Sequence, residues 1–103
     1  MSFYVLKILL PEKKIYDGEV TSIMAACENG PLTVLAGHAP MTAMLVEGPL
    51  VVKTEREVLA GIAGRGVLQV ARNEAVLMVH SFKWDGDDAE DASSQASGND
   101  TML

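Results

Sequence analysis

The chain has 103 residues, of which 49% are apolar, so it is long enough for one domain with a modest hydrophobic core. Its net charge is −6, but the first 84 residues balance eight Lys and Arg against eight Asp and Glu, which argues against the basic surface that nucleic-acid binding needs. No apolar run suffices to cross a bilayer, and no signal peptide is recognised at the N-terminus. The single cysteine, Cys27, excludes an internal disulfide and suits a reducing cytosol.

Short β-forming segments separated by Gly, Pro, Asn and Asp run through the first 84 residues. The strands that they predict are residues 3–10, 14–16, 19–26, 32–35, 42–46, 50–53, 57–62, 67–71 and 75–80. The turns between them are predicted at residues 11–13, 17–18, 28–31, 37–40, 48–49, 54–56, 64–66 and 72–74. Many short strands at this spacing indicate an all-β sandwich or barrel.

Two of these segments carry competing local signals. Asp17 and Gly18 form a strong hairpin dipeptide, so a turn is expected there. After it, Val20 and, beyond a bulge, Ile23 are expected to face the core. Residues 39–46 contain Met, Ala and Leu, which favour a helix, but the flanking Gly and Pro residues leave little room for one. We therefore predict a strand there.

The composition changes after Trp84. Residues 85–103 contain the other six acids of the chain, are rich in Ser and Gly, and have almost nothing to bury. Ordering such a segment would cost conformational entropy with no compensating burial. The predicted organisation is therefore one β-domain, residues 1–84, followed by a disordered acidic tail, residues 85–103.

Residues capable of metal or nucleophilic chemistry are few and scattered. His38 and His80 are far apart in the sequence, and neither belongs to a spacing that is typical of metal ligands. His80 closes an apolar strand and is expected at the surface. Cys27 follows two alanines, so a small packed residue is favoured over a nucleophile, although a Cys–His pair stays open at this point.

Phosphate binding and acid–base chemistry are also not indicated. Gly61, Gly64 and Gly66 lack the following helix and the Lys-Ser/Thr of a phosphate-binding loop, so we interpret them as places where backbones approach closely. Glu55 and Glu57 flank a basic residue in a predicted hairpin and are expected to be solvated charges. No catalytic site and no cofactor are predicted.

Three motifs in order carry a resemblance to a known family. The segment LPEKKIYDGEV, residues 10–20, resembles the opening of ATP synthase epsilon subunits. It is followed at the family's spacing by LTVLAGHAPMTA, residues 32–43, and by IAGRGVLQV, residues 62–70, with VLMV at residues 76–79 resembling the closing strand. The match covers about the first 80 residues in order and without large gaps.

The resemblance implies a flattened ten-stranded β-sandwich at the foot of a rotary ATPase central stalk. It also implies a bacterial subunit, peripheral to the membrane on its cytoplasmic face, that is bound to γ and to the c-ring and transmits torque without catalysing a reaction. Carried over by position, the partner-binding residues form a c-ring-facing loop and a nearby turn at the same lower edge. These residues are Glu28, Asn29, Gly30 and Pro31 in the loop, and Gly37, His38, Ala39 and Pro40 in the turn.

The sequence departs from the family pattern at several positions. Asn29 stands before the loop glycine where an acid is common, and Arg65 stands where the first of two glycines is usual. If that position needs a positive φ, Arg65 would cost on the order of 1 kcal/mol. Residues 85–103 are too few, too acidic and too poor in apolar periodicity for the C-terminal helical hairpin of typical epsilon subunits, so we expect neither auto-inhibition nor ATP binding.

Two other classes of function remain open at this point. The first is a stand-alone β-sandwich adaptor that retains the fold without the rotor role. The second is a small cupin-like metalloenzyme, which would require the imidazoles of His38 and His80 to converge in space.

Overall fold

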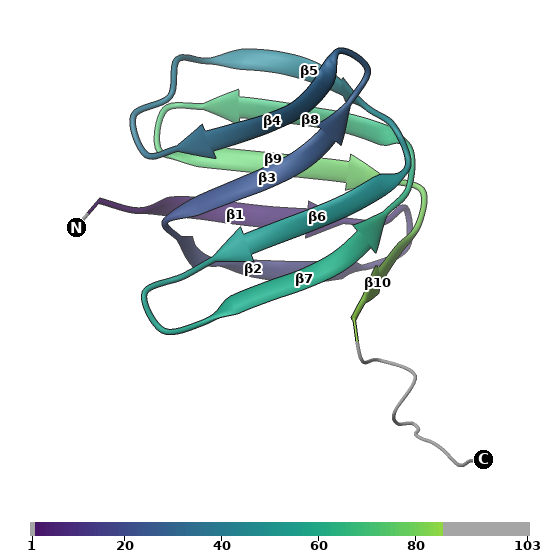
Figure 1. The fold of residues 1–103 in the computed structure, drawn as a ribbon, viewed down its shortest axis with the longest axis horizontal. Coiled ribbons are helices and arrows are strands. Elements are labelled where there is room, and N and C mark those ends of the chain that lie inside the picture. Colours follow the sequence, from purple (N-terminus) through teal and green to yellow (C-terminus); the bar gives the residue numbers. More distant parts are fainter. Residues whose placement is uncertain (1, 86–103) are drawn as a thin grey trace.

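The computed structural model describes residues 2–85, which form ten strands and no helix (Figure 1). The strands are β1 Tyr4–Leu9, β2 Lys14–Val20, β3 Ser22–Cys27, β4 Gly30–Leu35, β5 Met41–Leu45, β6 Gly48–Lys53, β7 Val58–Ala63, β8 Gly66–Ala71, β9 Glu74–Val79 and β10 Phe82–Trp84. The all-β prediction is therefore confirmed. The described residues form no helix long and apolar enough to cross a membrane. The predicted disordered tail lies outside them, apart from Asp85.

One continuous sheet folds over on itself to make two layers (Figure 1). The front layer contains β4, β3, β6, β7 and β10, and the back layer contains β5, β8, β9, β1 and β2. The layers are joined where the end of β3 pairs with the end of β5, through Cys27 and Leu45. Every strand pair is antiparallel except β1 with β9. The architecture is a β-sandwich whose loops gather at two opposite ends.

The core lies between the layers and follows the strand alternation. In β1, Tyr4, Leu6 and Ile8 are buried, whereas the residues between them are only half-buried. The same period of two places Leu50 and Val52 of β6 inside, and Val20 and Ile23 are buried as predicted. Each such side chain contributes roughly 1.5–3 kcal/mol of burial free energy.

Two contacts close the sandwich across the layers. The buried hydroxyl of Tyr4 in β1 donates to the carbonyl oxygen of Val34 in β4, at 2.7 Å. At the open seam between β10 and β2, the Trp84 ring meets Phe82 edge-on at a centroid distance of 4.6 Å and Tyr16 at 6.0 Å. The Tyr4–Val34 and Tyr16–Trp84 contacts tie the edge strands β4 and β10 to the opposite layer.

The structure corrects several predicted turns. Asp17 and Gly18 do not turn the chain but lie within β2, opposite Lys7 and Leu6 of β1. The predicted strand 19–26 is broken at Thr21, where the chain passes from β2 to β3. The hairpin signal is overridden because continued pairing with β1 buries Val20.

The two predicted Gly-Pro turns are also shorter than expected. Gly30 and Pro31 open β4, and Gly48 and Pro49 open β6, so only the residues before them turn. The strand predicted at residues 42–46 is β5, Met41–Leu45, which pairs with β8 along its whole length. β10 was not predicted, since three residues are too few to show a period.

Arg65 is accommodated without strain. Asn73 is the one non-glycine residue with a positive φ, 64°, among those described. Because Arg65 has no positive φ, the conditional cost expected at this position does not arise.

We predict that Tyr4→Phe lowers the free energy of unfolding by about 1–2 kcal/mol, because it removes a buried hydrogen bond between the layers. Urea denaturation followed by Trp84 fluorescence measures the loss. Thr33→Val, on the outer side of β4, is the matched control and should change the free energy by less than about 0.5 kcal/mol. Equal effects of the two substitutions would contradict the bridging role of Tyr4.

The same variant should change the pH dependence of stability. Burial raises the pKa of the Tyr4 hydroxyl far above its usual range, and a backbone hydrogen bond with Ile23 opposes this by a smaller amount. A group whose pKa is raised in the folded state stabilises below its unfolded pKa, and the stabilisation is lost as the pH rises above it. From about pH 10 upward, the wild type should therefore lose up to about 1.4 kcal/mol per pH unit through Tyr4, and Tyr4→Phe should lose less.

Candidate interaction surfaces

The two histidines do not converge. His38 lies in the β4–β5 loop, beyond the end of β5 that pairs with Val70, whereas His80 follows Val79, which pairs with Gly66 at the other end of β8. The length of β8 separates them by roughly 15–20 Å. Residues 2–85 contain no group of three or more His, Cys, Asp or Glu side chains that could hold a metal ion. The cupin-like hypothesis, which requires the imidazoles to converge, is therefore wrong.

Cys27 behaves as a packing residue. It is half-buried at the end of β3 and packs against the core, with its Sγ 4.0 Å from the carbonyl oxygen of Ala25. Burial raises the pKa of the thiol, which keeps it protonated at neutral pH. A protonated, half-buried thiol is a poor nucleophile, as the sequence predicted.

The predicted loop at residues 28–31 is the β3–β4 hairpin. Glu28 and Asn29 are the exposed turn residues, and Gly30 follows with a φ of 115° that few L-residues adopt. The backbone N–H of Glu28 donates to the carbonyl oxygen of Met44 at 3.0 Å, which holds the turn against β5. Pro31 is exposed on the edge strand β4, where the lack of an N–H is tolerated.

The predicted turn at residues 37–40 connects β4 to β5. Gly37 has a φ of 85°, and the backbone N–H of His38 donates to the carbonyl oxygen of Leu35 at 3.1 Å. The His38 side chain is bonded locally, since its Nδ1 lies 2.8 Å from the carbonyl oxygen of Ala39 and donates to it in the matching tautomer. This imidazole thus helps to shape the turn.

The two predicted partner-binding segments lie at opposite ends of β4, so the expectation that they share one edge of the sandwich is wrong. Gly30 pairs with Cys27 at one end of the β3–β4 ladder, and Leu35 pairs with Ser22 at the other. Six residues of strand separate the segments by about 20 Å. A partner that contacts both segments would therefore also cover the outer side of β4.

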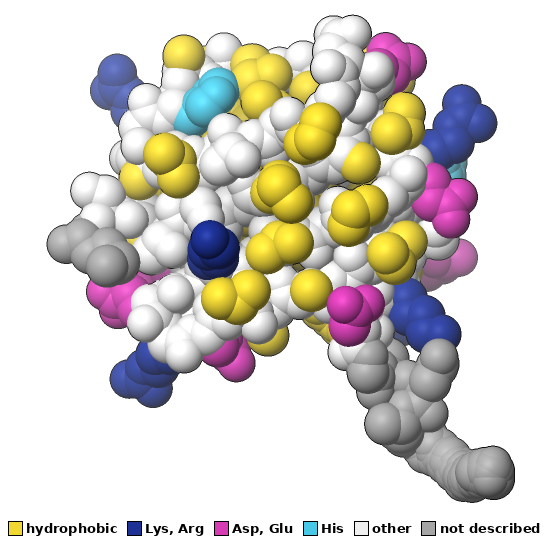
Figure 2. Space-filling model, viewed as in Figure 1, with side chains coloured by type: hydrophobic (Ala, Val, Ile, Leu, Met, Phe, Trp, Pro, Cys, Tyr) yellow, Lys and Arg dark blue, Asp and Glu magenta, His cyan; other side chains and the backbone are white. Residues whose placement is uncertain are grey.

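The outer surface of the front layer is largely apolar (Figure 2). The register places twelve outward side chains of β4, β3, β6 and β7 side by side, and nine of them are apolar. The apolar ones are Leu35, Val58, Met24, Val51, Ala60, Pro31, Ala26, Pro49 and Ile62, and the polar ones are Ser22, Thr33 and Lys53. We call these twelve residues the front face. Sequence analysis missed it, because its members become neighbours only through strand pairing.

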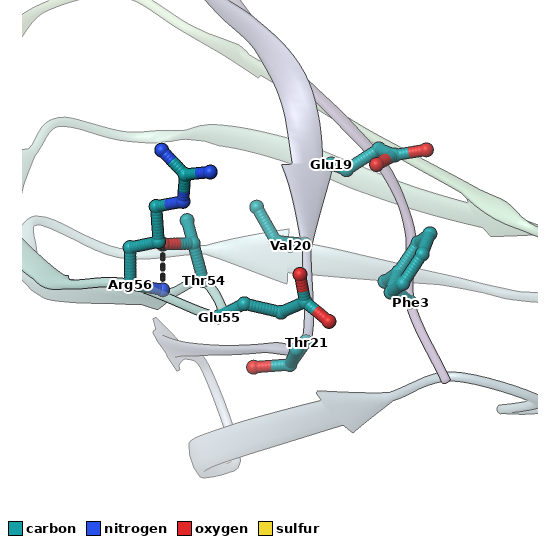
Figure 3. Close-up of a pocket in the computed structure, with 7 residues that line it drawn as sticks. All are labelled: Phe3, Glu19, Val20, Thr21, Thr54, Glu55 and Arg56. Atoms are coloured by element: carbon teal, nitrogen blue, oxygen red, sulfur yellow. Dashed lines mark hydrogen bonds between the residues drawn. The ribbon is translucent and has the colours of Figure 1, made fainter. Parts of the chain in front are cut away.

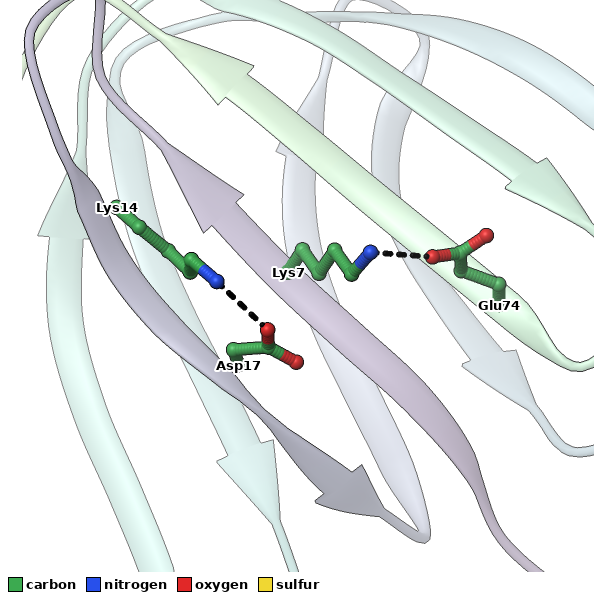
Figure 4. A network of polar contacts seen from close by, with 4 residues as sticks. All are labelled: Lys7, Lys14, Asp17 and Glu74. Carbon is green, nitrogen blue, oxygen red and sulfur yellow. Dashed lines mark hydrogen bonds and ion pairs between the residues drawn. The ribbon is translucent and has the colours of Figure 1, made fainter.

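The outer surface of the back layer is more polar. Lys7 of β1 pairs with Glu74 of β9 at 3.2 Å, and Lys14 pairs with Asp17 within β2 at 2.9 Å (Figure 4). The pairing with Lys14 holds the pKa of the Asp17 carboxyl below its usual value. These pairs are solvent-exposed, so they contribute little to stability. They leave this part of the back layer polar and solvent-exposed.

A small mixed-charge depression lies at the end of the sandwich near the N-terminus (Figure 3). Its volume is about 140 Å³, and Glu19, Glu55 and Arg56 line it together with Phe3. The hydroxyl of Thr54 accepts from the backbone N–H groups of Arg56 and Glu57, at 3.2 and 3.1 Å, and so shapes the β6–β7 turn. The charged side chains that line the depression are exposed and do not converge on one point, as is usual at a solvent-exposed turn.

Comparison with known proteins agrees with the fold and the motifs. Residues 4–85 match the family model of the ATP synthase delta/epsilon chain β-sandwich domain. The chain is 38% identical to the ATP synthase epsilon chain of Chlorobaculum tepidum over 77 residues, which cover 73% of this chain and 86% of that relative. It is 30% identical to that of Clostridium kluyveri over 84 residues, which cover 80% of this chain and 63% of that relative.

Solved structures show the same fold. A chain in the mitochondrial ATP synthase of Euglena gracilis, in an OSCP/F1/c-ring structure, superposes with a TM-score of 0.78 at 20% identity, over 90% of this chain and 61% of that one. A chain in the central stalk/c-ring structure of the Tetrahymena thermophila enzyme gives 0.67 at 19% identity, over 95% and 80%. The described residues are therefore the β-sandwich of this group, and the chain belongs to the ATP synthase delta/epsilon chain family.

Proposed function

We propose that this chain is a non-catalytic central-stalk subunit of an F-type ATP synthase, which couples ion flow through the c-ring to the catalytic head through γ. The observation that carries the proposal is the front face. The largest continuous apolar patch on a soluble protein is often a binding site, and a subunit held in an assembly would have such a patch covered. Family membership supplies the assembly.

The front face is smaller than a standard protein interface, so a docked partner would also cover the surface around it. Four strands about 4.8 Å apart and six residues long give an area of roughly 400 Å². A standard protein interface buries about 800 Å² on each partner. The γ subunit would therefore cover the front face together with neighbouring loops, of which the turn at residues 37–40 is one.

The remaining expectations follow from the family. The turn at Glu28 and Asn29 would face the c-ring, in line with the c-ring assemblies that contain the structural relatives. The curated relatives come from bacteria, so we place the chain on the cytoplasmic face of a bacterial plasma membrane, peripheral to the bilayer through the c-ring. The role needs no cofactor, metal or nucleic acid.

The stand-alone adaptor is the competing hypothesis. It accounts for the fold but not for an uncovered front face, unless an unrelated partner covers it. Copurification separates the two hypotheses, because only a stalk subunit brings γ, the catalytic subunits and the c-ring with it.

We predict that Met24→Glu weakens copurification of γ with the tagged chain from its native membranes. Met24 lies at the centre of the front face, between Thr33 and Val51, so a docked partner would bury the new carboxylate. The cost should be at least about 2 kcal/mol, or roughly thirtyfold in affinity. Mass spectrometry of the recovered subunits measures it.

The matched control is Gln69→Glu, which adds the same charge to the exposed outer surface of β8. It should leave the recovery of γ unchanged. Both variants should keep the wild-type urea midpoint, because each substituted side chain is exposed. Recovery of γ with Met24→Glu at the wild-type level would contradict docking through the front face, and wild-type recovery of none of the ATP synthase subunits would favour the adaptor.

We also predict that ATP does not bind this chain. The glycines of residues 61–66 leave no cradle for a phosphate, since a Cβ on Gly61 would lie 2.6 Å from the carbonyl oxygen of Lys83 and one on Gly64 would meet Ser81. A site with a Kd of about 10 µM would stabilise the fold by roughly 2.7 kcal/mol at 1 mM MgATP, which would raise Tm by roughly 10–20 °C. Scanning calorimetry of the full chain should show a shift below about 1 °C, and a rise above about 5 °C would contradict this expectation.

A further inference from the structure

The β3–β4 turn contains a dipeptide with its own covalent chemistry. Asn29 is exposed in this turn and directly precedes Gly30. An asparagine followed by glycine is the pair most prone to spontaneous deamidation, because glycine has no side chain to shield its backbone nitrogen from the asparagine amide. The chain has asparagines at positions 29, 73 and 99, and Asn29 is the one that a glycine follows.

The structure leaves the reacting groups of this dipeptide accessible. A Cβ on Gly30 would meet no atom within 4 Å, so the space beside this residue is open. Within residues 2–85, no hydrogen bond or ion pair holds the Asn29 side chain. Its amide can therefore turn toward the backbone nitrogen of Gly30 without first breaking a contact with the protein.

The position of Gly30 in the sheet also favours the reaction. Gly30 pairs with Cys27, and this is the last pair of the β3–β4 ladder, beside the turn. The ends of a ladder open with a much smaller free energy than its middle. The Gly30 nitrogen is thus released more readily than that of any residue further along β4.

Asn73 provides a comparison within the same chain. It also lies in an exposed turn, between β8 and β9, but Glu74 follows it. The Glu74 side chain stands beside the backbone nitrogen that the Asn73 amide would need, and its pairing with Lys7 at 3.2 Å keeps it in place. The backbone N–H of Val5 also donates to the carbonyl oxygen of Asn73 at 3.0 Å, which fixes this turn to β1.

We propose that Asn29 is a covalent modification site, which deamidates spontaneously in the folded chain to aspartate and isoaspartate. This inference goes beyond the proposed function and does not depend on it. The deprotonated backbone nitrogen of Gly30 attacks the Cγ of Asn29, and the new bond closes a five-membered succinimide ring. The side-chain nitrogen takes up a proton and leaves as ammonia.

Water then opens the succinimide at one of its two carbonyl carbons. Breaking the bond between Cγ and the ring nitrogen gives aspartate with the original main chain. Breaking the bond between the backbone carbonyl carbon and the ring nitrogen gives isoaspartate, in which the main chain passes through Cγ and is one atom longer. Either route consumes one water molecule and releases one ammonia, so no oxidant, metal or cofactor is needed.

The two products differ in their effect on the fold. Aspartate adds one negative charge beside Glu28 on an exposed turn and leaves the backbone unchanged. Isoaspartate lengthens the chain between Cys27 and Gly30, in the turn that adjoins the joint between the layers. There the N–H of Glu28 donates to the carbonyl oxygen of Met44 at 3.0 Å, and Cys27 pairs with Leu45. The isoaspartyl form should therefore be the less stable of the two.

Prolonged incubation of the folded full chain at mildly alkaline pH, followed by peptide mapping with mass spectrometry, tests the site. The Asn29 amide should be lost at least about tenfold faster than that of Asn73, and faster as the pH rises, because the attacking nitrogen must be deprotonated. Asn29→Gln should abolish the change in this peptide, since a glutamine would have to close a less favourable six-membered ring. A parallel sample unfolded in urea gives the rate without the turn.

The stability of each product is measured after ion exchange separates the aged chains. Methylation by an isoaspartyl methyltransferase with S-adenosylmethionine identifies the isoaspartyl fraction. Its urea midpoint, followed by Trp84 fluorescence, should lie below that of the Asn29→Asp variant. That variant should match the freshly purified wild type, because its new carboxylate is exposed.

Equal loss of the amide at Asn29 and Asn73 would overturn the proposal, and so would loss that is confined to the unfolded sample. An isoaspartyl fraction with the same urea midpoint as Asn29→Asp would contradict the effect on the joint between the layers. None of these results bears on the recovery of γ with the tagged chain, so failure of this inference leaves the proposed function standing.

Discussion

Strand register is the constraint on which the rest of this structure depends. Because successive side chains of a strand point to opposite sides, one register places Leu6, Ile8, Leu50 and Val52 in the core and at the same time decides what both outer surfaces present. A slip of one residue in β6 would bury Lys53 and expose Leu50 and Val52. The front face is therefore a consequence of the same pairing that stabilises the fold.

The sequence was most informative where burial and local pattern agree. Strands at residues 32–35, 50–53, 67–71 and 75–80 were predicted because short β-forming segments end at clear turn signals, and the structure places β4, β6, β8 and β9 there to within two residues at each end. The turn predicted at Asp17 and Gly18 was wrong, because continued pairing of β2 with β1 outweighs the local preference of this dipeptide for a hairpin. β10 was not predicted, because pairing with Gly61 of β7 and the contact of the Trp84 ring with Tyr16 position its three residues.

The candidate surfaces were harder to predict than the strands. Both partner-binding segments were named from a resemblance, and their separation along β4 became visible only from the β3–β4 register. Met24, Val51 and Ala60 are far apart in the sequence, yet they form one row of the front face. Because the row joins residues of different strands, the pattern within any one segment cannot predict it. The same limit left open whether His38 and His80 met, a question that the strand order answers.

Two features of the front face limit unwanted association while leaving it open to a partner. An exposed apolar sheet beside an unpaired edge strand is a site for unwanted association. The edge strand β4 has Pro31 near its start, which offers no N–H to an incoming strand, and Lys53 interrupts the apolar rows of the face. These two features discourage strand addition and stacking but leave Met24 and its neighbours open to a partner of matching shape. The chain thus keeps an apolar surface that benefits from being covered in an assembly, at a tolerable risk while it is alone.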